Sequence, residues 1–302
     1  MANIIALIWD FDKTLVDGYM QDPIFNHYGI DASEFWREVN SLPEKYFNEQ
    51  NIQVNRDTIY LNHFINYAKM GRLKGLTNKK LEEFGKELKF YPGIPEIFKK
   101  TKEIVNSKQE YNEYNIKVEH YIVSTGMAAI IRGSQIYGEV EKIWGCELLE
   151  DEYNDEKIIS EIGYTIDNTT KTRAIFEINK GIPQNSEINV NVKMPEDIRR
   201  VHINNMIYIA DGPSDIPAFS LINKNKGSTF AIYPKGNQKA FEQVEKMRMD
   251  GRINMYAEAD YRDNTTAYMW LCYKVKEIAD RIRNIEKSKI TSSISSVPQH
   301  LV

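Results

Sequence analysis

The sequence predicts an α/β protein with a doubly wound, mostly parallel sheet and a helical segment inserted after the first strand. Two observations predict the sheet: short apolar runs recur along the chain, and amphipathic helical patterns separate them. A third observation predicts the insert, because no convincing strand pattern occurs between about residues 18 and 90. With 302 residues, 42% of them hydrophobic, the chain is long enough to bury a sizeable core.

Four apolar runs are the predicted strands. They are short, rich in β-branched or aromatic residues and apolar on both faces, as expected for parallel strands that helices cover on both sides. They read IIALIW at 4–9, HYIVS at 120–124, MIYIA at 206–210 and TFAIY at 229–233. Residues 93–107 and 265–285 carry apolar side chains at helical spacing, which predicts long helices that pack on the sheet.

The region from about residue 18 to residue 90 predicts helices only. Apolar residues recur at three- and four-residue steps within 19–28, 32–40, 57–70 and 79–88, and the breakers in YPGIP at 91–95 mark the return to the sheet domain. We therefore expect a core of residues 1–17 and 91–287, a helical insert at 18–90 and a flexible tail at 288–302. Residues 182–205 are long for a connection, and we expect a small hairpin or a lid there.

Composition excludes several classes of function. A net charge of −4 provides no basic field that would attract nucleic acid, and no stretch is long and apolar enough to span a membrane. Cys146 and Cys272 lack the spacing of a zinc site or of a disulfide framework, which fits a reducing compartment. The N-terminal apolar run is too short for a signal peptide, so we expect a cytoplasmic protein.

Carboxylates follow two of the predicted strands. Asp10 ends the first strand and Asp12 lies on the loop after it, whereas Asp211 follows the third strand and Asp215 comes after a Gly-Pro turn. Ligands bind beyond the carboxyl ends of the strands in such a sheet. Paired carboxylates suit a reaction in which one attacks and the other manages the proton of the leaving oxygen. A helix cap or a turn is the plainer explanation of any one of these aspartates.

Groups that suit an anion lie between these aspartates in the chain. Ser124, Thr125 and Gly126 follow the second strand and offer hydroxyl and backbone N–H groups at a predicted helix start. Lys171 lies in the first turn of another predicted helix, where the helix dipole disfavours a cation and a bound anion would compensate. Taken singly, these residues are better explained as an ordinary helix cap and a solvated surface lysine.

In combination, these segments resemble the haloacid dehalogenase-like (HAD) hydrolase superfamily, within its phosphatase branch. The matching stretches, in the order of the family's four motifs, are DFDKTL at 10–15, IVSTG at 122–126, TKTR at 170–173 and IADGPSDIPAF at 209–219. Phosphoserine-phosphatase-like members are the most similar branch. The motifs cover the sheet domain, whereas the insert matches the family's cap by position and helical character alone.

The resemblance implies a role for each residue. Asp10 would be the nucleophile that accepts the phosphoryl group, and Asp12 would protonate the leaving alcohol and then activate water. Ser124 and Lys171 would hold the phosphoryl oxygens, with help from the backbone N–H groups of Phe11, Thr125 and Gly126.

A magnesium site is also implied by the resemblance. Mg²⁺ would bind the Asp10 carboxylate, the Asp12 backbone carbonyl and Asp211, while Asp215 is either a further ligand or a residue that orients Lys171. Electrostatics supports a cation independently, because each close pair of like charges costs on the order of 4 kcal/mol at a separation of about 4 Å. A hard divalent cation with oxygen ligands offsets that repulsion.

We therefore expect a Mg²⁺-dependent phosphatase that acts on a small phosphorylated metabolite, with neither nucleic acid nor membrane as a partner. An aspartate at position 12 disfavours a dehalogenase, because a halide leaves without a proton. Two alternatives remain open: a phosphomutase of the same superfamily and a non-catalytic module that binds a phosphorylated ligand. The sequence names neither the substrate nor the oligomeric state.

Overall fold

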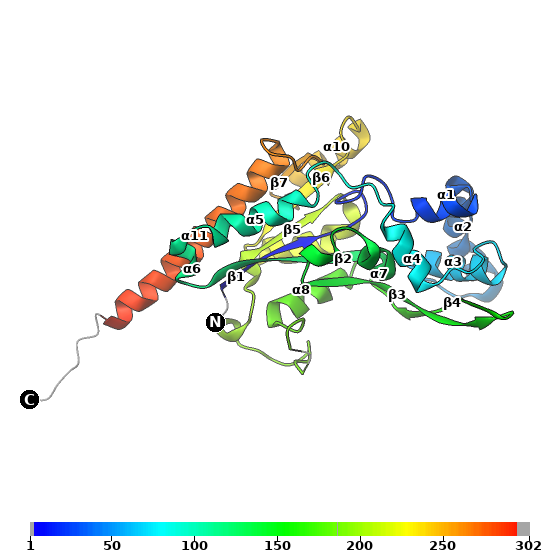
Figure 1. Ribbon diagram of the computed structural model, residues 1–302, viewed down its shortest axis with the longest axis horizontal. Coiled ribbons are helices and arrows are strands. Elements are labelled where there is room, and N and C mark those ends of the chain that lie inside the picture. Colours follow the sequence, from blue (N-terminus) through cyan, green and yellow to red (C-terminus); the bar gives the residue numbers. More distant parts are fainter. Residues whose placement is uncertain (1–2, 186, 295–302) are drawn as a thin grey trace, which may run out of the picture.

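The computed structural model describes residues 3–185 and 187–294. Its centre is a seven-stranded sheet with the strand order β4-β3-β2-β1-β5-β6-β7. All neighbouring strands are parallel except β3 and β4, which are antiparallel. The strands are β1 (Asn3–Trp9), β2 (Ile116–Met127), β3 (Lys142–Tyr153), β4 (Glu156–Tyr164), β5 (Met206–Ala210), β6 (Ser228–Tyr233) and β7 (Met255–Glu258). The predicted α/β fold class is confirmed (Figure 1).

The sheet is doubly wound about its first strand. From β1 the chain adds β2 and β3 on one side and later β5, β6 and β7 on the other, so the strand order reverses between β1 and β5. Helices α5 (Glu96–Asn106) and α11 (Thr266–Ile294) contact each other and lie above the sheet in Figure 1, with α8 (Lys171–Lys180) below it. The remaining helices of the sheet domain are α6 (Gln109–Asn112), α7 (Ala128–Gly133), α9 (Ile216–Lys224) and α10 (Gln238–Met249).

The first strand forms the middle of the core. Every side chain from Ile5 to Trp9 is fully buried, which explains why this run is apolar on both faces. The Trp9 indole N–H donates to His120 Nδ1 at 3.0 Å, and His120 Nε2 lies 3.0 Å from the hydroxyl of Thr101 on α5. Because an indole only donates, Nδ1 is the acceptor and the neutral imidazole carries its proton on Nε2.

The insert after β1 is helical, as predicted. Its helices are α1 (Asp22–Tyr28), α2 (Ala32–Gln50), α3 (Ile59–Lys69) and α4 (Asn78–Gly85), at the right in Figure 1. The Asp31 carboxylate caps α2 by accepting the Glu34 N–H at 3.0 Å. The helix α2 runs beyond its predicted end at residue 40 and contains Pro43, a residue that usually ends a helix.

The chain enters and leaves the insert through two adjacent segments. The Asp17 N–H donates to the Lys89 carbonyl at 2.8 Å, and the Tyr91 N–H donates to the Leu15 carbonyl at 2.9 Å. The insert's last helix, α4, packs directly on α7 of the sheet domain. Gly133 permits this close approach, because any side chain there would overlap the backbone of α4. The insert is therefore held both at these two segments and by helix packing.

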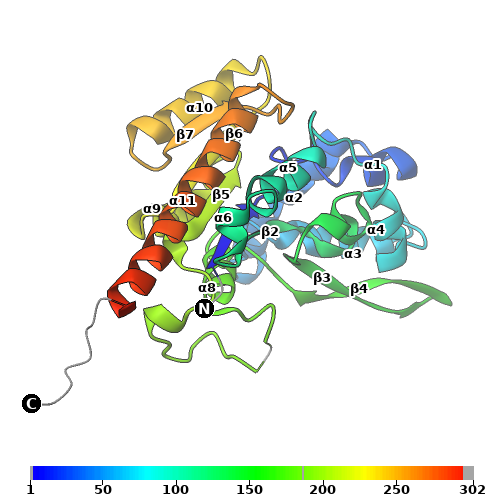
Figure 2. The same cartoon turned by 60° about the vertical axis from the view of Figure 1, so that its left-hand side comes forward.

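The hairpin formed by β3 and β4 was not predicted. Its two-residue turn, Asn154 and Asp155, has φ angles of 50° and 61°, as hairpin turns of this length require. Helix α3 packs on β4, so the hairpin lies against the insert (Figure 2). Of the hairpin or lid expected at 182–205, the hairpin is absent: apart from residue 186, which is not described, the stretch contains only irregular chain and the 3₁₀ turns Glu196–Ile198 and Ile203–Asn205.

The C-terminal helix extends further than predicted. The tail expected at 288–302 begins inside α11, which continues to Ile294, and residues 295–302 lie outside the described part of the chain. Of the helices that are described, none combines the length and apolar character needed to cross a membrane.

Candidate active site

Three aspartates from separate parts of the chain meet at one edge of the sheet. Asp10 follows β1, Asp211 follows β5 and Asp215 ends the 3₁₀ turn Pro213–Asp215. A carboxylate oxygen from each lies within 4.8 Å of the other two. Because β1 and β5 are the strands between which the order reverses, the cluster occupies the position where such sheets bind ligands. The structure thus brings together three of the aspartates singled out in the sequence.

Lys171 is buried between two of these aspartates. Its ammonium lies 2.8 Å from Asp10 Oδ1 and 2.7 Å from Asp215 Oδ1, and only 1% of its side chain is exposed. The helix dipole at the start of α8 and the loss of water both disfavour this charge. Burial alone would lower the pKa of Lys171, but the carboxylates outweigh burial and raise it, so the lysine stays charged.

Asp215 has no exposed surface, and both of its oxygens accept hydrogen bonds. The Tyr208 hydroxyl donates to Oδ1 at 2.6 Å and the Ser214 hydroxyl donates to Oδ2 at 2.9 Å. This network fixes the carboxylate that holds Lys171, which favours the orienting role among the two considered for Asp215. Tyr208 and Ser214 were not singled out in the sequence, although a tyrosine inside the apolar run MIYIA was a usable signal.

The two remaining members of the cluster resist ionisation. Burial, opposed by Lys171 and reinforced by Asp215, raises the pKa of Asp10 to about 6. Burial and then the charge of Asp10 raise the pKa of Asp211 to about 7. Oxygen-only donors that converge and repel one another fit a hard divalent cation, so the residues present are compatible with magnesium.

Asp12 is not one of the three converging aspartates, although the charges of Asp10 and Asp211 act on it. It is half-buried on the loop after β1, and its Oδ1 accepts the backbone N–H of Met20 at 2.9 Å. Burial, followed by the charge of Asp10, raises the pKa of Asp12 well above its ordinary value. A protonated carboxyl group is the form that a general acid needs. Its backbone carbonyl remains the atom that we expect to face a cation.

The Ser-Thr-Gly segment lies in the end of a strand, not at the start of a helix as predicted. β2 continues to Met127 with an irregular register after Val123, and α7 begins only at Ala128. Since Trp9 pairs with Ile122, Ser124 lies at the same sheet edge as Asp10. The buried Ser124 hydroxyl accepts the Gly126 N–H at 3.0 Å, so this N–H is already engaged within the segment.

A residue from the insert contacts this segment. The Tyr60 hydroxyl, on α3, donates to the Thr125 carbonyl at 2.8 Å, and the Cys146 thiol donates to the same oxygen at 3.3 Å. Neither contact is visible in the sequence, because 65 residues separate Tyr60 from Thr125 and 21 separate Cys146 from it.

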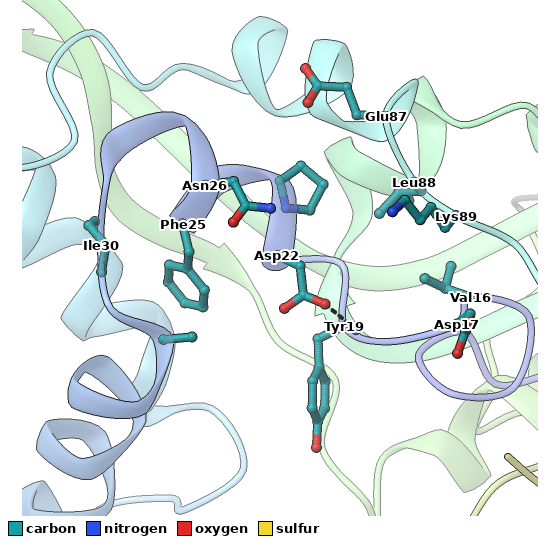
Figure 3. Close-up of a pocket in the computed structure, with 12 residues that line it drawn as sticks. Val16, Asp17, Tyr19, Asp22, Phe25, Asn26, Ile30, Glu87, Leu88 and Lys89 are labelled. Atoms are coloured by element: carbon teal, nitrogen blue, oxygen red, sulfur yellow. Dashed lines mark hydrogen bonds between the residues drawn. The ribbon is translucent and has the colours of Figure 1, made fainter. Parts of the chain in front are cut away.

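A pocket of about 430 Å³ lies where the insert joins the sheet domain (Figure 3). Asp22, one of its lining residues, accepts the Tyr19 N–H at 3.0 Å and is close enough to add to the raised pKa of Asp12. Its lining includes Val16, Asp17, Tyr19, Asp22, Glu87 and Lys89, and no residue of the three-aspartate cluster. The pocket is therefore adjacent to the candidate site and separate from it.

No protein-family model matches the sequence. An uncharacterized protein of Borreliella burgdorferi is 38% identical over 287 residues, which cover 90% of this chain and 97% of that protein.

Solved structures share the fold at much lower identity. The HAD family hydrolase t0658 from Salmonella enterica serovar Typhi aligns with a TM-score of 0.54 at 13% identity, over 90% of this chain and 71% of that one. A phosphoserine phosphatase with a phospho-aspartyl intermediate analogue aligns with a TM-score of 0.49 at 18% identity, over 86% and 97% of the two chains. The fold assignment rests on the Salmonella hydrolase. The chain therefore belongs to one protein family with the Borreliella burgdorferi protein and has the fold of the haloacid dehalogenase-like hydrolases.

Proposed function

We propose that the protein is a divalent-cation-dependent phosphatase that hydrolyses a small phosphomonoester through a phosphorylated aspartate. The observation that carries this proposal is the position of the Asp10 carboxylate, against the buried ammonium of Lys171 and beside Asp211 at the switch point of the sheet. The fold shared with a HAD family hydrolase supports the same class of reaction.

In the first step, a carboxylate oxygen of Asp10 attacks phosphorus. Lys171 engages Oδ1, which leaves Oδ2 available for the attack. A bond forms between this oxygen and phosphorus while the bond to the leaving alcohol oxygen breaks. Asp12 donates its proton to that oxygen, an assistance typically worth about 10²- to 10⁴-fold in rate.

In the second step, Asp12 acts as a general base instead of a general acid. Its carboxylate takes a proton from water, and the water oxygen attacks phosphorus. The bond between phosphorus and Asp10 breaks, which releases inorganic phosphate and restores both aspartates to their starting states. The single hydrogen bond from the Met20 N–H to Asp12 Oδ1 leaves Oδ2 as the oxygen that exchanges this proton.

The phosphoryl oxygens would be held by Lys171, Ser124 and the N–H of Gly126. An ammonium group has three protons to donate, and Asp10 and Asp215 use two of those of Lys171. The third proton remains for a phosphoryl oxygen. The Ser124 hydroxyl now accepts from Gly126, and binding of an anion would recruit the hydroxyl and the N–H as donors.

We further propose that Asp10 and Asp211 hold the cation, with Asp215 close enough to contribute. When bound, Mg²⁺ would supply positive charge against the repulsion among the carboxylates and the incoming phosphate. Residues 18–90 would cover the site as a cap and exclude water, which favours a small metabolite as the substrate. The contact of Tyr60 with Thr125 supports this position of the cap.

The test is a screen of phosphorylated metabolites with Mg²⁺ present. Both released phosphate and isomerised product are measured, because a phosphomutase would give the second. Asp10→Asn removes the nucleophile, and the matched control Asp151→Asn changes an exposed aspartate on β3. We expect the wild type and Asp151→Asn to release phosphate and Asp10→Asn to be inactive. If phosphorylated ligands bind to the wild type and none is turned over, the protein is a binding module and the proposal is wrong.

A further inference from the structure

We propose that Tyr60 is a positioning residue through which the insert strengthens the phosphate-binding N–H of Gly126. This inference rests on the proposed function and goes beyond it, because it assigns a task to a residue outside the four motifs. It makes the affinity for phosphate depend on how helix α3 packs against the sheet domain.

Tyr60 is a buried residue of the insert that contacts the sheet domain. It lies in the first turn of α3 and is 6% exposed, and its ring packs against Trp36 and Phe64 at centroid distances of 5.8 Å and 6.2 Å. Its hydroxyl is 2.8 Å from the Thr125 carbonyl. Since burial and then the nearby Cys146 and Asp12 raise the pKa of Tyr60 well above its ordinary value, the hydroxyl keeps its proton and stays a donor.

The Thr125 carbonyl and the Gly126 N–H belong to the same peptide group. A donor on the carbonyl oxygen polarises the peptide and makes its N–H a stronger donor. Two hydrogen bonds therefore connect the Tyr60 hydroxyl, through this peptide group, to the Ser124 hydroxyl. The Cys146 thiol, at 3.3 Å from the same carbonyl, is a weaker donor and does not replace the phenol.

The chain segment just before Tyr60 also contacts the loop that leads to Lys171. The Asn55 side-chain amide donates to Asp167 at 3.0 Å, and the Asn168 N–H donates to the Asp57 carboxylate at 3.2 Å. Residues 55–60 of the insert thus contact both segments that are proposed to hold phosphate. Movement of this part of the insert would loosen both segments together.

The test compares Tyr60→Phe with the matched control Tyr67→Phe. Both tyrosines are buried on α3, but the Tyr67 hydroxyl donates to Glu38 within the insert, at 2.6 Å, and not to the sheet domain. Each variant loses one hydroxyl and keeps its ring, so both remain folded. The readouts are the affinity for inorganic phosphate, kcat and KM for any substrate, and the chemical shift of the Gly126 amide proton.

The Gly126 amide can be observed selectively. Thr125–Gly126 is the only Thr-Gly pair in the sequence, so ¹³C-carbonyl threonine combined with ¹⁵N-glycine isolates its signal. We expect Tyr60→Phe to move this signal upfield and to weaken phosphate binding by about 3- to 10-fold, the value of one hydrogen bond. Tyr67→Phe should change neither quantity.

The outcomes separate this inference from the proposed function. An unchanged Gly126 signal and unchanged phosphate affinity in Tyr60→Phe would overturn the inference, even if the wild type is an active phosphatase. A shifted Gly126 signal and weakened phosphate binding in a protein that turns over no phosphate ester would support the inference and count against the phosphatase proposal. Equal effects of Tyr60→Phe and Tyr67→Phe would reduce the role of Tyr60 to packing and overturn the inference.

Discussion

The ammonium of Lys171 and the carboxylate of Asp10 lie 2.8 Å apart and buried, although 161 residues separate them in the chain. Neither group tolerates such burial alone, because an unpaired buried charge is strongly destabilising. Each charge therefore offsets the cost of burying the other, and Asp215 contacts the lysine from a second side. This pair ties the first strand of the sheet to the helix that follows its outermost hairpin.

Removal of the lysine should destabilise the protein in a pH-dependent way. We expect Lys171→Met to lower the free energy of unfolding by about 3–5 kcal/mol at pH 8 without metal, the typical cost of breaking a buried pair. At pH 5 the loss should be smaller, because the pKa of Asp10 is about 6 beside the lysine and higher without it, so Asp10 takes up a proton and no longer needs a partner.

Lys157→Met is the control for this experiment. It breaks a pair on the hairpin in which Lys157 is 66% exposed and Glu150 is 16% exposed, and pairs with a solvent-exposed cation contribute about 0–1 kcal/mol. Chemical denaturation at both pH values measures the difference. Equal losses in the two variants would show that the Lys171 pair is not the stabilising contact described above.

A divalent cation should stabilise the protein more at pH 8 than at pH 5. The pKa values of about 6 for Asp10 and about 7 for Asp211 are above the ordinary value of 3.8, so the folded protein binds protons more tightly than the unfolded chain. Without metal, stability from this source is present at low pH and is lost as the pH rises through 6 to 7.

A bound cation removes that loss, and at pH 5 it must compete with the protons. Melting temperatures with Mg²⁺ and with a chelator, measured at pH 5 and pH 8, check this prediction. A shift of the same size at both pH values would contradict a site built from these carboxylates. Asp211→Asn should reduce the shift at pH 8.

Replacement of Asp12 should discriminate between leaving groups. We expect Asp12→Asn to lower kcat by about 10²- to 10⁴-fold for alkyl phosphates, whose leaving oxygen needs a proton. With p-nitrophenyl phosphate the fall should be much smaller, because p-nitrophenolate leaves without one. Steady-state kinetics on both substrates, with the melting temperature as a check on folding, decide the point. An equal loss for both substrates would argue against the general acid.

His120 should make the core sensitive to acid. Burial, with a smaller contribution from the charge of Lys102, lowers the pKa of His120 from 6.5 to about 3. Below pH 6.5 the unfolded chain therefore binds a proton at His120 that the folded protein does not bind. The free energy of unfolding consequently falls as the pH drops from 6.5 towards 3, by up to about 1.4 kcal/mol per pH unit.

His120→Gln is the variant that isolates this effect. It should be less stable than the wild type at neutral pH, because the contacts with Trp9 and Thr101 are disturbed. Its stability should fall less steeply between pH 6.5 and pH 4, since the titrating group is gone. The difference between the two pH profiles cancels the carboxylates common to both proteins. Parallel profiles would refute the assignment.

The parts of the fold and site that could be predicted are those determined by short, local stretches of sequence. The buried strand at 4–9 is apolar on both faces, and Asp10 directly follows it. Because parallel strands present their carboxyl ends at one edge, this local pattern was sufficient to place Asp10 near Asp211. The approach of Lys171 to Asp10 was expected only through the family resemblance.

The parts that were missed depend on mixed patterns or on distant contacts. The strands β3 and β4 carry many charged, exposed residues, which hides the alternation that marks a strand. The Asn154–Asp155 turn was the one local signal of that hairpin. The bond from Tyr60 to Thr125 depends on how the insert packs against the sheet domain, and no local pattern encodes it.

The most direct measurement is the site of phosphorylation during turnover. The wild type and Asp10→Asn are mixed with p-nitrophenyl phosphate and Mg²⁺, quenched in acid within one turnover and analysed by peptide mass spectrometry. We predict one phosphoryl group on the peptide that contains Asp10 in the wild type, and none in the variant. Turnover without this adduct in the wild type, or an adduct of equal yield in Asp10→Asn, would contradict the account.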